Sequence, residues 1–411
     1  MTKKKIVFVI NSFYPDFAST GQLLTELCLD LQQDFEITVI ASQPEFSQDQ
    51  GSQRLFECDE LEDIKIIRLR LPKVDKTSKV SRLINIGLYF TLALIALLRE
   101  KKVNIIYTIS QPPILGGFIG SIGKFLKRSK HVYNIQDFNP EQAEAVSYMD
   151  KQFIFNMARK VDNLNCRYSD HVILVGHDMA ETLKNRFTGR TIPQHSVINN
   201  WTDEKDIVPL DKAEKHVASF IEEYQLENKF IIMYSGNIGL YYDLENIIKV
   251  TKHFKDNQDI VFIFVGDGAV KKEMQSYVNE QNIKNVLFIP FQLKEFIKYS
   301  LNAADVHLVV NQKGIKGVSV PSKIYGVMAA GKAILGVLEQ GSEAQILIEA
   351  SHCGVVVEPQ DYDGIIDAIN QLFAFSEDQR EQLGANGRIY LDKHLKREDS
   401  IAKYRELLLQ L

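Results

Sequence analysis

The feature that most limits the fold of this chain is a regular alternation of short apolar runs with longer helical patterns. The runs are rich in valine, isoleucine and phenylalanine, and polar turns bound them, which is typical of buried strands in βαβ units. Because the runs divide evenly between the two halves, we expect an α/β fold with two Rossmann-like, doubly wound parallel sheets. The predicted strands are Ile6–Ile10, Ile37–Ala41, Ile64–Leu69, Ile105–Ile109, Val132–Ile135, Val172–Val175, Phe230–Tyr234, Val261–Val265, Val286–Ile289, Val306–Val310, Ala333–Val337 and Gly354–Val357.

The chain length of 411 residues also favours two domains, since single cores stop growing near ~250–300 residues. A polar stretch at Val197–Glu214 lacks periodicity and marks the boundary. We predict an N-terminal domain over 1–200 and a second domain over 201–394, with an amphipathic helix at about 395–411 packing back on the first. Ligands of such sheets bind at the carboxyl ends of strands, so two facing sheets would form a cleft.

Composition excludes few functions. The net charge of −5 argues against a nucleic-acid binder, and the apolar run Ile6–Ile10 is too short for a signal peptide, so we expect a cytoplasmic protein. No cysteine pair has the C-x-x-C spacing of a zinc ribbon or a redox dithiol. The four cysteines are Cys28, Cys58, Cys166 and Cys353.

An uncharged segment, Leu83–Leu98, lies between Arg82 and the basic residues Arg99, Lys101 and Lys102. Its sixteen residues fall short of the ~20 that a bilayer requires. Two interpretations remain open at this stage. The segment is either a buried core helix or a helix partly embedded in a membrane face and held there by its basic flanks.

Two glycine-containing turns follow successive predicted strands of the second half. Gly236 and Gly239 in "YSGNIG", and Gly266 with Asp267 in "FVGDG", would let the backbone approach an anion at a helix start. The second loop lacks the third glycine of a dinucleotide fingerprint. The alternative for each loop is a tight turn without a ligand.

The stretch "VPSKIYGVMAAGK" predicts a short helix with Lys323 in its first turn, where the helix dipole disfavours a cation. A phosphate held by Lys323, with Ser322 capping the helix or binding the phosphate, would explain this placement. A surface lysine is the alternative. Glu343, near the start of the next predicted helix, is either a favourable charge at the dipole or an acceptor for a ribose diol.

The first half offers two further loops after strands. "NSFYPDFASTGQ" contains Asp16, Thr20 and Gly21, and "NIQDFNPE" contains Asp137 and Glu141. Carboxylates at a strand end can bind a hydroxyl or act as general acid or base, although they can also simply cap the next helix.

Taken together, these motifs resemble the retaining GT-B glycosyltransferases of family 4, in the bacterial surface-polysaccharide branch of the WbuB- and WcaI-like transferases. The motifs keep the order of that family along nearly the whole chain. The resemblance implies that the N-terminal half binds the acceptor and the C-terminal half binds a nucleotide sugar, with no metal or other cofactor. The implied donor-binding residues are Gly236, Asn237, Gly239, Gly266, Asp267, Ser322, Lys323 and Glu343, the implied acceptor-binding residues are Asp16, Thr20, Gly21 and Glu141, and the implied catalytic residues are Asp137 and Lys323.

The sequence departs from the family pattern at two places. Gln136 stands where many relatives carry the histidine of a His-Asp pair. The Glu-x7-Glu element of many members falls on Val318 and Gly326, so both carboxylates are missing. The diphosphate charge is then expected to be met by Lys323, with Lys313 or Lys316 as helpers, and the ribose by Glu343.

The resemblance implies transfer of a sugar, UDP-linked and possibly N-acetylated, to a polyprenyl-diphosphate-linked acceptor for O-antigen, capsule or exopolysaccharide at the inner face of the plasma membrane. The alternatives are a GT-B sugar-nucleotide epimerase, a Rossmann NAD(P) enzyme and a non-catalytic nucleotide-sugar-binding protein.

Overall fold

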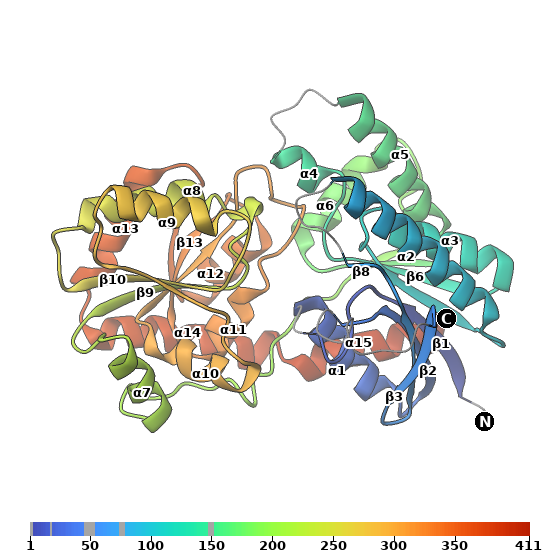
Figure 1. Ribbon diagram of the computed structural model, residues 1–411, viewed down its shortest axis with the longest axis horizontal. Coiled ribbons are helices and arrows are strands. Elements are labelled where there is room, and N and C mark those ends of the chain that lie inside the picture. The colour runs from blue at the N-terminus through green and yellow to red at the C-terminus, as the bar shows by residue number, and fades with distance from the viewer. Residues whose placement is uncertain (1–2, 17–18, 45–53, 74–78, 147–151) are drawn as a thin grey trace. The chain divides into compact units, whose positions relative to one another are not determined.

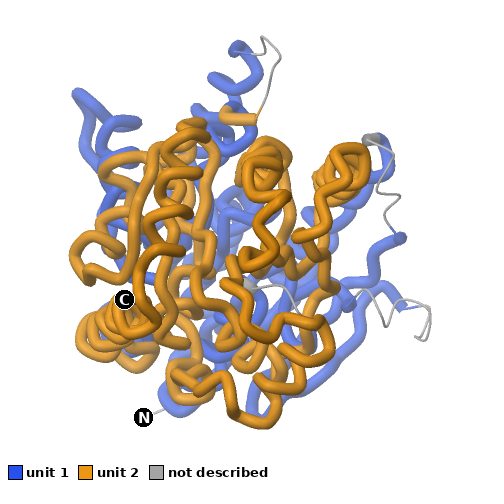
Figure 2. The backbone as a smooth tube through the Cα atoms, turned by 90° about the vertical axis from the view of Figure 1, so that its left-hand side faces the viewer, with its two compact units in different colours: residues 1–144, 148–199, 400–411 blue, residues 145–147, 200–399 orange. Residues whose placement is uncertain are grey.

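The computed structural model of the chain describes residues 3–16, 19–44, 54–73, 79–146 and 152–411. The backbone divides into two compact units (Figure 2). Unit 1 comprises Met1–Glu144, Tyr148–Asn199 and Ser400–Leu411, and unit 2 comprises Ala145–Ser147 and Asn200–Asp399. The sequence-based division placed the main boundary after residue 200 and assigned the last helix to the first domain.

Unit 1 contains an eight-stranded sheet in the order β3-β4-β2-β1-β5-β6-β7-β8. Every neighbouring pair is parallel except β3 with β4, which form an antiparallel hairpin at the edge. The strands are β1 (Lys4–Val9), β2 (Phe35–Ser42), β3 (Phe56–Leu61), β4 (Ile64–Leu69), β5 (Ile105–Ile109), β6 (Lys130–Ile135), β7 (His171–Leu174) and β8 (His195–Val197).

Helices cover this sheet on both faces (Figure 1). On one face α2 packs against α3, and α3 packs against α5. On the other, α15 lies along α1, because Arg405 on α15 forms ion pairs with Asp30 and Asp34. The helices are α1 (Ser19–Leu31), α2 (Lys79–Arg99), α3 (Leu115–Lys127), α4 (Glu141–Ala145), α5 (Gln152–Tyr168), α6 (His177–Arg186) and α15 (Arg397–Gln410).

Unit 2 contains a six-stranded, fully parallel sheet in the order β11-β10-β9-β12-β13-β14. These strands begin and end within a residue of the predicted ones, because each is a short, nearly continuous apolar run of the kind that a two-sided parallel sheet buries. They are β9 (Phe230–Ser235), β10 (Ile260–Val265), β11 (Val286–Ile289), β12 (Val306–Val310), β13 (Ala333–Val337) and β14 (Gly354–Val357).

Two layers of helices bury the faces of the unit 2 sheet (Figure 1). Residues of α8, η3, α9 and α13 pack on one face, and residues of α7, α10, α11, α12 and α14 pack on the other. Their bounds are α7 (Lys215–Glu223), η2 (Leu240–Tyr242), α8 (Leu244–Ile247), η3 (Ile248–Phe254), α9 (Lys271–Glu280), α10 (Lys294–Ala303), α11 (Lys323–Ala329), α12 (Glu343–Ser351), α13 (Tyr362–Ala374) and α14 (Glu377–His394).

The fold confirms the predicted α/β class with two parallel sheets, and it adds two strands that the apolar pattern did not predict. β3 has the sequence FECDEL, and its middle residues are exposed, so it carries no buried-strand signal. β8 is only three residues long and half-buried. Both strands lie at an edge of the sheet, where strands need fewer apolar side chains.

The helix α2 was open to two interpretations, and its structure shows features of both. One side packs into the core of unit 1 through Tyr89, Leu92 and Leu97, while Leu83 and Ile84 on another side are exposed. Within the described residues, Val80–Arg99 is long and apolar enough to cross a membrane by length and composition, and most of it is not buried in the protein.

The packing of α15 on the sheet of unit 1 depends on Tyr404. Its ring is buried, and its centroid lies 6.4 Å from that of Tyr107. The side-chain amide of Asn134 on β6 donates to the hydroxyl oxygens of both tyrosines, at 2.5 Å to Tyr107 and 2.9 Å to Tyr404. A buried polar group satisfied on both sides fixes α15 in one position on the sheet.

We predict that Tyr404→Ala lowers the free energy of unfolding of unit 1 by about 3 kcal/mol, because it removes a buried aromatic side chain and leaves the Asn134 amide with an unmet donor. Chemical denaturation followed by circular dichroism measures the change. Leu409→Ala on the same helix is the matched control; Leu409 is half-exposed, and we expect a change below about 0.5 kcal/mol. Equal losses in the two variants would contradict the assigned role of Tyr404.

Candidate functional site

Four neighbouring strands of unit 2 end at the same edge of its sheet. β10, β9, β12 and β13 are adjacent and parallel, so the segments that follow them emerge side by side. Those segments contain the donor-site residues predicted from the sequence: Gly266 and Asp267 after β10, Gly236, Asn237 and Gly239 after β9, Ser322 and Lys323 after β12, and Glu343 after β13.

The ammonium group of Lys323 lies at this edge of the sheet, in contact with two tyrosine side chains. Its Nζ donates a hydrogen bond to the hydroxyl of Tyr234 at 2.7 Å and lies 3.9 Å from the centroid of that ring. The ring of Tyr242 lies 4.2 Å from the same nitrogen. Two tyrosines from the β9–α8 segment therefore hold the cation by cation–π contacts and one hydrogen bond.

Burial lowers the pKa of Lys323 from 10.5 to about 7, and among the described residues no carboxylate pairs with its ammonium. A buried cation without a counter-charge is costly, since rings and hydroxyls replace only part of the hydration that water would supply. Near neutral pH the side chain is thus divided between its charged and neutral forms. An anion bound beside it would restore the charged form.

Two glycines make room next to this lysine. Gly236 has a φ of +140°, and a Cβ atom there would lie 3.5 Å from Cε of Lys323. Gly266 has a φ of +136°, and a Cβ atom there would lie 2.0 Å from the carbonyl oxygen of Gly236. The backbones after β9 and β10 are therefore packed so closely that a side chain at Gly266 is excluded.

The local structure around Lys323 confirms the predicted helix. Ile324, Val327 and Met328 form its buried face, and Gly331 follows its C-terminus with a φ of +63°. The backbone of Ser322 has helical angles, and its side chain makes no capping hydrogen bond. Capping, one of the two roles expected of Ser322, is not observed.

A backbone hydrogen bond joins the loops after β9 and β10, since the amide of Ile238 donates to the carbonyl of Asp267 at 2.8 Å. The loop after β9 is also fixed internally by the hydroxyl of Tyr234, which donates to the carbonyl of Asn237 at 2.6 Å. The side chains of Asn237 and Asp267 are exposed, while Gly239 is buried. The carboxylate of Asp267 accepts from the amide of Gly268.

The segment after β12 is fixed by Glu339, which follows β13. The carboxylate of Glu339 accepts from the backbone amides of Gly314 and Lys316, at 2.8 and 3.0 Å. Nζ of Lys316 donates to the carbonyl of Gln340, whereas Lys313 is exposed. Of the two helper lysines expected from the sequence, Lys316 already binds a backbone carbonyl.

Glu343 is the first residue of α12 and is buried. The helix dipole favours a carboxylate in this first turn, which is one of the two roles expected of Glu343. The structure therefore places Glu343 at the strand edge that also contains Lys323, two strands away from β9. Its role toward a ribose stays a prediction.

The predicted acceptor residues lie in unit 1, at the carboxyl ends of β1 and β6. Asp16 is half-buried in the segment after β1, and Thr20 and Gly21 lie in the first turn of α1. A Cβ atom at Gly21 would lie 3.2 Å from the carbonyl of Ser12, so this glycine allows α1 to approach the preceding loop.

Asp137 follows β6 and is half-buried. Its carboxylate accepts from the side-chain amide of Gln142 at 3.0 Å, and its backbone amide donates to the hydroxyl of Ser110 at 3.2 Å. Gln136, at the position of the family's histidine, is buried and donates to Asn134. Asp137 is thus positioned by the segment after β5 and by α4, and its catalytic role stays a prediction.

Glu141 is held in an ion-pair network. It contacts Arg186, and its Oε1 lies 2.8 Å from Arg159. Arg186 also pairs with the buried Asp162 at 2.6 Å. Burial alone would raise the pKa of Glu141, but the charge of Arg186 and the hydrogen bonds from Arg186 and Arg159 outweigh it and lower the pKa. The network gives Glu141 a structural role, and acceptor binding by it stays a prediction.

Sequence reasoning missed the two residues that define the cation site, Tyr234 and Tyr242. Tyr234 lies in β9 and Tyr242 in the segment that follows it, but nothing in their spacing indicates that they face a lysine more than eighty residues later in the chain. A useful signal was the adjacency of β9 and β12 in a doubly wound order, which brings the two segments together.

The sequence is similar to a known protein family and to two glycosyltransferases. Residues 218–390 match the family described as Glycosyl transferases group 1. The chain is 28% identical over 280 residues to a probable glycosyltransferase, WbjE, of Pseudomonas aeruginosa, covering 67% of each chain. It is 24% identical over 392 residues to a putative colanic acid biosynthesis glycosyl transferase, WcaI, of Escherichia coli K12, covering 90% and 91%.

Solved structures support the fold. Sucrose-phosphate synthase from Thermosynechococcus elongatus aligns with a TM-score of 0.79 and 15% identity over 99% of both chains. Anabaena HepE in complex with UDP aligns with a TM-score of 0.71 and 15% identity, over 99% of this chain and 100% of that one. At such identities the likeness shows the fold alone. Together with the family match, it confirms the prediction of a glycosyltransferase with the GT-B fold.

We predict that Lys323→Met leaves the melting temperature of the free protein unchanged or raises it, because methionine keeps the apolar stem and removes an uncompensated buried charge. Differential scanning calorimetry without ligand measures this. Tyr234→Phe is the matched control, and we expect it to cost about 1 kcal/mol because the carbonyl of Asn237 loses its donor. A clear fall in melting temperature for Lys323→Met would assign the lysine a structural role.

Proposed function

We propose that the chain is a retaining glycosyltransferase that moves a sugar from a nucleoside diphosphate, preferably UDP, to a lipid-linked acceptor in surface-polysaccharide biosynthesis. The observation that carries this proposal is the ammonium of Lys323, buried between Tyr234 and Tyr242 beside Gly236. A cation without a carboxylate partner at a glycine-lined strand edge is suited to bind the diphosphate of a donor.

Similar proteins support UDP as the donor nucleotide and polysaccharide biosynthesis as the pathway. Anabaena HepE was solved in complex with UDP and with UDP-glucose, and it shares the fold of this chain. The name of WcaI places that relative in colanic acid biosynthesis. We extend both properties to this chain: UDP as the nucleotide, and an extracellular polysaccharide such as O-antigen or capsule as the product. An N-acetylated donor sugar remains a prediction from the family resemblance.

The chemistry that this edge can supply is stabilisation of the leaving group. The bond between the anomeric carbon and the diphosphate oxygen breaks, and negative charge develops on the diphosphate. We propose that Lys323 neutralises that charge, with Ser322 and the amides near Gly236 as further donors. Such preorganised electrostatic stabilisation usually lowers the barrier more than any other catalytic effect. In this proposal lysine supplies the positive charge, and turnover is expected to persist in EDTA.

Retention of configuration follows if the acceptor hydroxyl attacks from the side of the leaving group. The new bond forms between the acceptor oxygen and the anomeric carbon, and a diphosphate oxygen takes the hydroxyl proton. We assign to Asp137, positioned by Gln142 and Ser110, the binding of the acceptor hydroxyl, and to Asp16, Thr20 and Gly21 the contacts around it. Glu343 is our candidate for the ribose hydroxyls.

We further propose that unit 1 docks on the inner face of the plasma membrane, where a polyprenyl-diphosphate acceptor would be presented. The support is the helix α2, which buries Tyr89 and Leu97 but leaves Val80, Leu83 and Ile84 more than half exposed. Apolar side chains flanked by cations are typical of helices that lie in a membrane interface.

We predict that UDP binding takes up close to one proton per site at pH 8. In the protein without UDP, the side chain of Lys323 has a pKa of about 7 and is mostly a neutral amine at pH 8. A bound diphosphate raises that pKa, so the amine takes up a proton. Affinity should therefore weaken as the pH rises from 7 to 9. UDP itself contributes little, since its terminal phosphate ionises near ~6. Isothermal titration calorimetry in buffers of different ionisation enthalpy measures the uptake.

The control for this titration is Lys323→Met, which we expect to bind UDP at least tenfold more weakly and with no proton uptake. Lys284→Met, which removes an exposed charge at the amino edge of the same sheet, should retain the wild-type value. Tight UDP binding by Lys323→Met would exclude a diphosphate at this lysine.

The proposed reaction is tested with UDP-sugars and a polyprenyl-diphosphate-linked acceptor. We expect formation of glycosylated lipid and stoichiometric release of UDP in the presence of EDTA, and proton NMR of the product should show the anomeric configuration of the donor. Release of UDP that does not require the acceptor, with a changed sugar, would indicate an epimerase instead. Binding of UDP-sugar without turnover of any acceptor would favour a non-catalytic binding protein.

A further inference from the structure

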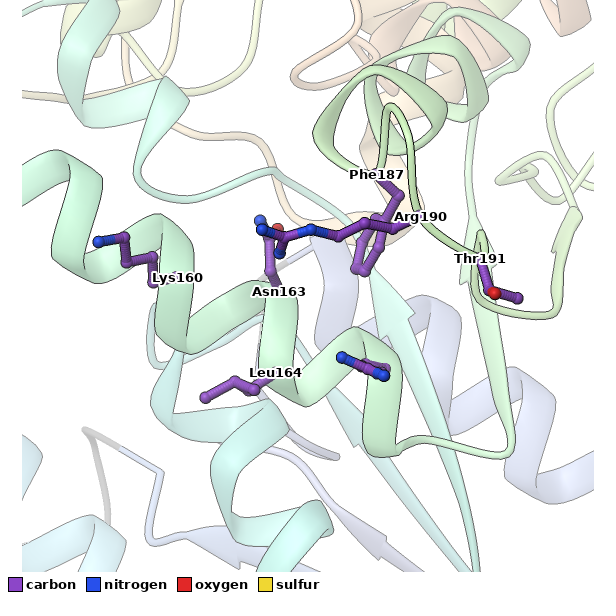
Figure 3. Close-up of a pocket in the computed structure, with 7 residues that line it drawn as sticks. Lys160, Asn163, Leu164, Phe187, Arg190 and Thr191 are labelled. Carbon is purple, nitrogen blue, oxygen red and sulfur yellow. The ribbon is translucent and has the colours of Figure 1, made fainter.

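We propose that a pocket on unit 1, between α5 and the segment that leads from α6 to β8, binds the phosphate headgroup of an anionic phospholipid. This inference rests on the proposed docking of unit 1 on a membrane and adds a specific headgroup site to it. The pocket has a volume of about 590 Å³ (Figure 3).

The lining of the pocket is cationic. Lys160 and Arg167 come from α5, and Arg190 comes from the segment before β8. All three are exposed, and among the described residues none of them has a carboxylate partner. No acidic side chain lines the pocket. Three unpaired cations around one cavity favour an anion, and arginine is suited to phosphate because its planar fork can donate two parallel hydrogen bonds.

Asn163 supplies a second, independent observation. It lines the pocket, and its Oδ1 is buried without a hydrogen-bond donor. Figure 3 shows Arg190 extending from its loop toward Asn163 on α5. A buried carbonyl oxygen of this kind requires a donor. A glycerol hydroxyl would supply that donor once the Asn163 side chain turns into the pocket, because its oxygen is covered in the present conformation. The headgroup phosphate would meet the cations, so the chemistry fits phosphatidylglycerol-type lipids.

The surrounding helices have the charge that an anionic surface attracts. The sequences of α2, α3 and α5 contain one acidic residue, Asp162, and its carboxylate is buried against Arg186. Two of their basic side chains have acidic partners outside these helices: Lys124 pairs with Asp170, and Arg159 pairs with Glu141 and Glu144. Lys160 and Arg167 of α5 have no such partner among the described residues. The excess of basic over acidic residues in these helices favours a membrane that contains anionic lipids over a neutral one.

The same three helices also present the apolar surface that a membrane contact needs. They carry more than half of the exposed large hydrophobic side chains of the described residues, including Phe125 at 83% and Phe153 at 78% exposure. Leu164 and Phe187 line the pocket itself, and Leu164 is half-exposed. A headgroup in the pocket would leave its acyl chains beside this apolar surface.

The position of the pocket separates it from the predicted acceptor residues. It is lined by the C-terminal part of α5 and by the segment that enters β8, which lie at the amino edge of the parallel sheet. Asp16 and Asp137 follow strands and lie at the carboxyl edge. The pocket is thus suited to anchor unit 1 and does not belong to the site of transfer.

The experiment is vesicle flotation of the full chain with phosphatidylcholine vesicles that contain or lack phosphatidylglycerol, in about 0.3 M salt to weaken diffuse attraction. The test variant is Lys160→Gln, Arg167→Gln and Arg190→Gln combined. The matched control is Lys3→Gln, Lys396→Gln and Lys403→Gln, which removes three exposed cations that lie outside α2, α3, α5 and their flanks.

We expect the pocket variant to bind phosphatidylglycerol vesicles at least tenfold more weakly than wild type and the control variant to lose less than threefold, with unchanged melting temperatures. Equal losses would show diffuse attraction and overturn the pocket. If wild type does not bind vesicles but is stabilised by inorganic phosphate, and the pocket variant loses that stabilisation, the pocket binds free phosphate and the assignment of a lipid headgroup is wrong. UDP binding, unaffected in the pocket variant, tests the proposed function separately.

Discussion

The parallel pairing of β9 with β10 and β12 is the constraint on which the candidate site depends. Because parallel strands send all their carboxyl ends to one edge, residues far apart in the sequence meet there. Lys323 reaches Tyr234 and Tyr242 only because β9 and β12 are neighbours in the sheet. Gly266 allows the loops after β9 and β10 to pack closely, since a Cβ atom there would lie 2.0 Å from the carbonyl oxygen of Gly236.

Lys323 also shows how stability and function compete at this edge. Folding places a cation between two aromatic rings without a carboxylate, and burial lowers the pKa of its side chain to about 7. Such an arrangement costs stability in the free protein, and binding of a dianion offsets that cost.

The parallel sheets could be predicted well because their buried strands consist of continuous apolar runs, as in IVFIFV of β10. The sequence did not predict β3, whose exposed residues carry no such pattern. The helix after Ser322 and its end at Gly331 follow from local rules. The partners of Lys323 and the ion pairs of Glu141 depend on tertiary contacts, which spacing along the chain does not reveal.

The most direct test of a diphosphate at Lys323 is a crystal structure of the chain with UDP bound. Occupation of the predicted site would place a diphosphate oxygen about 3 Å from Nζ of Lys323, with the ammonium turned from the hydroxyl of Tyr234 toward the phosphate. UDP bound elsewhere, with Lys323 still donating to Tyr234, would contradict the assignment of this edge as the donor site.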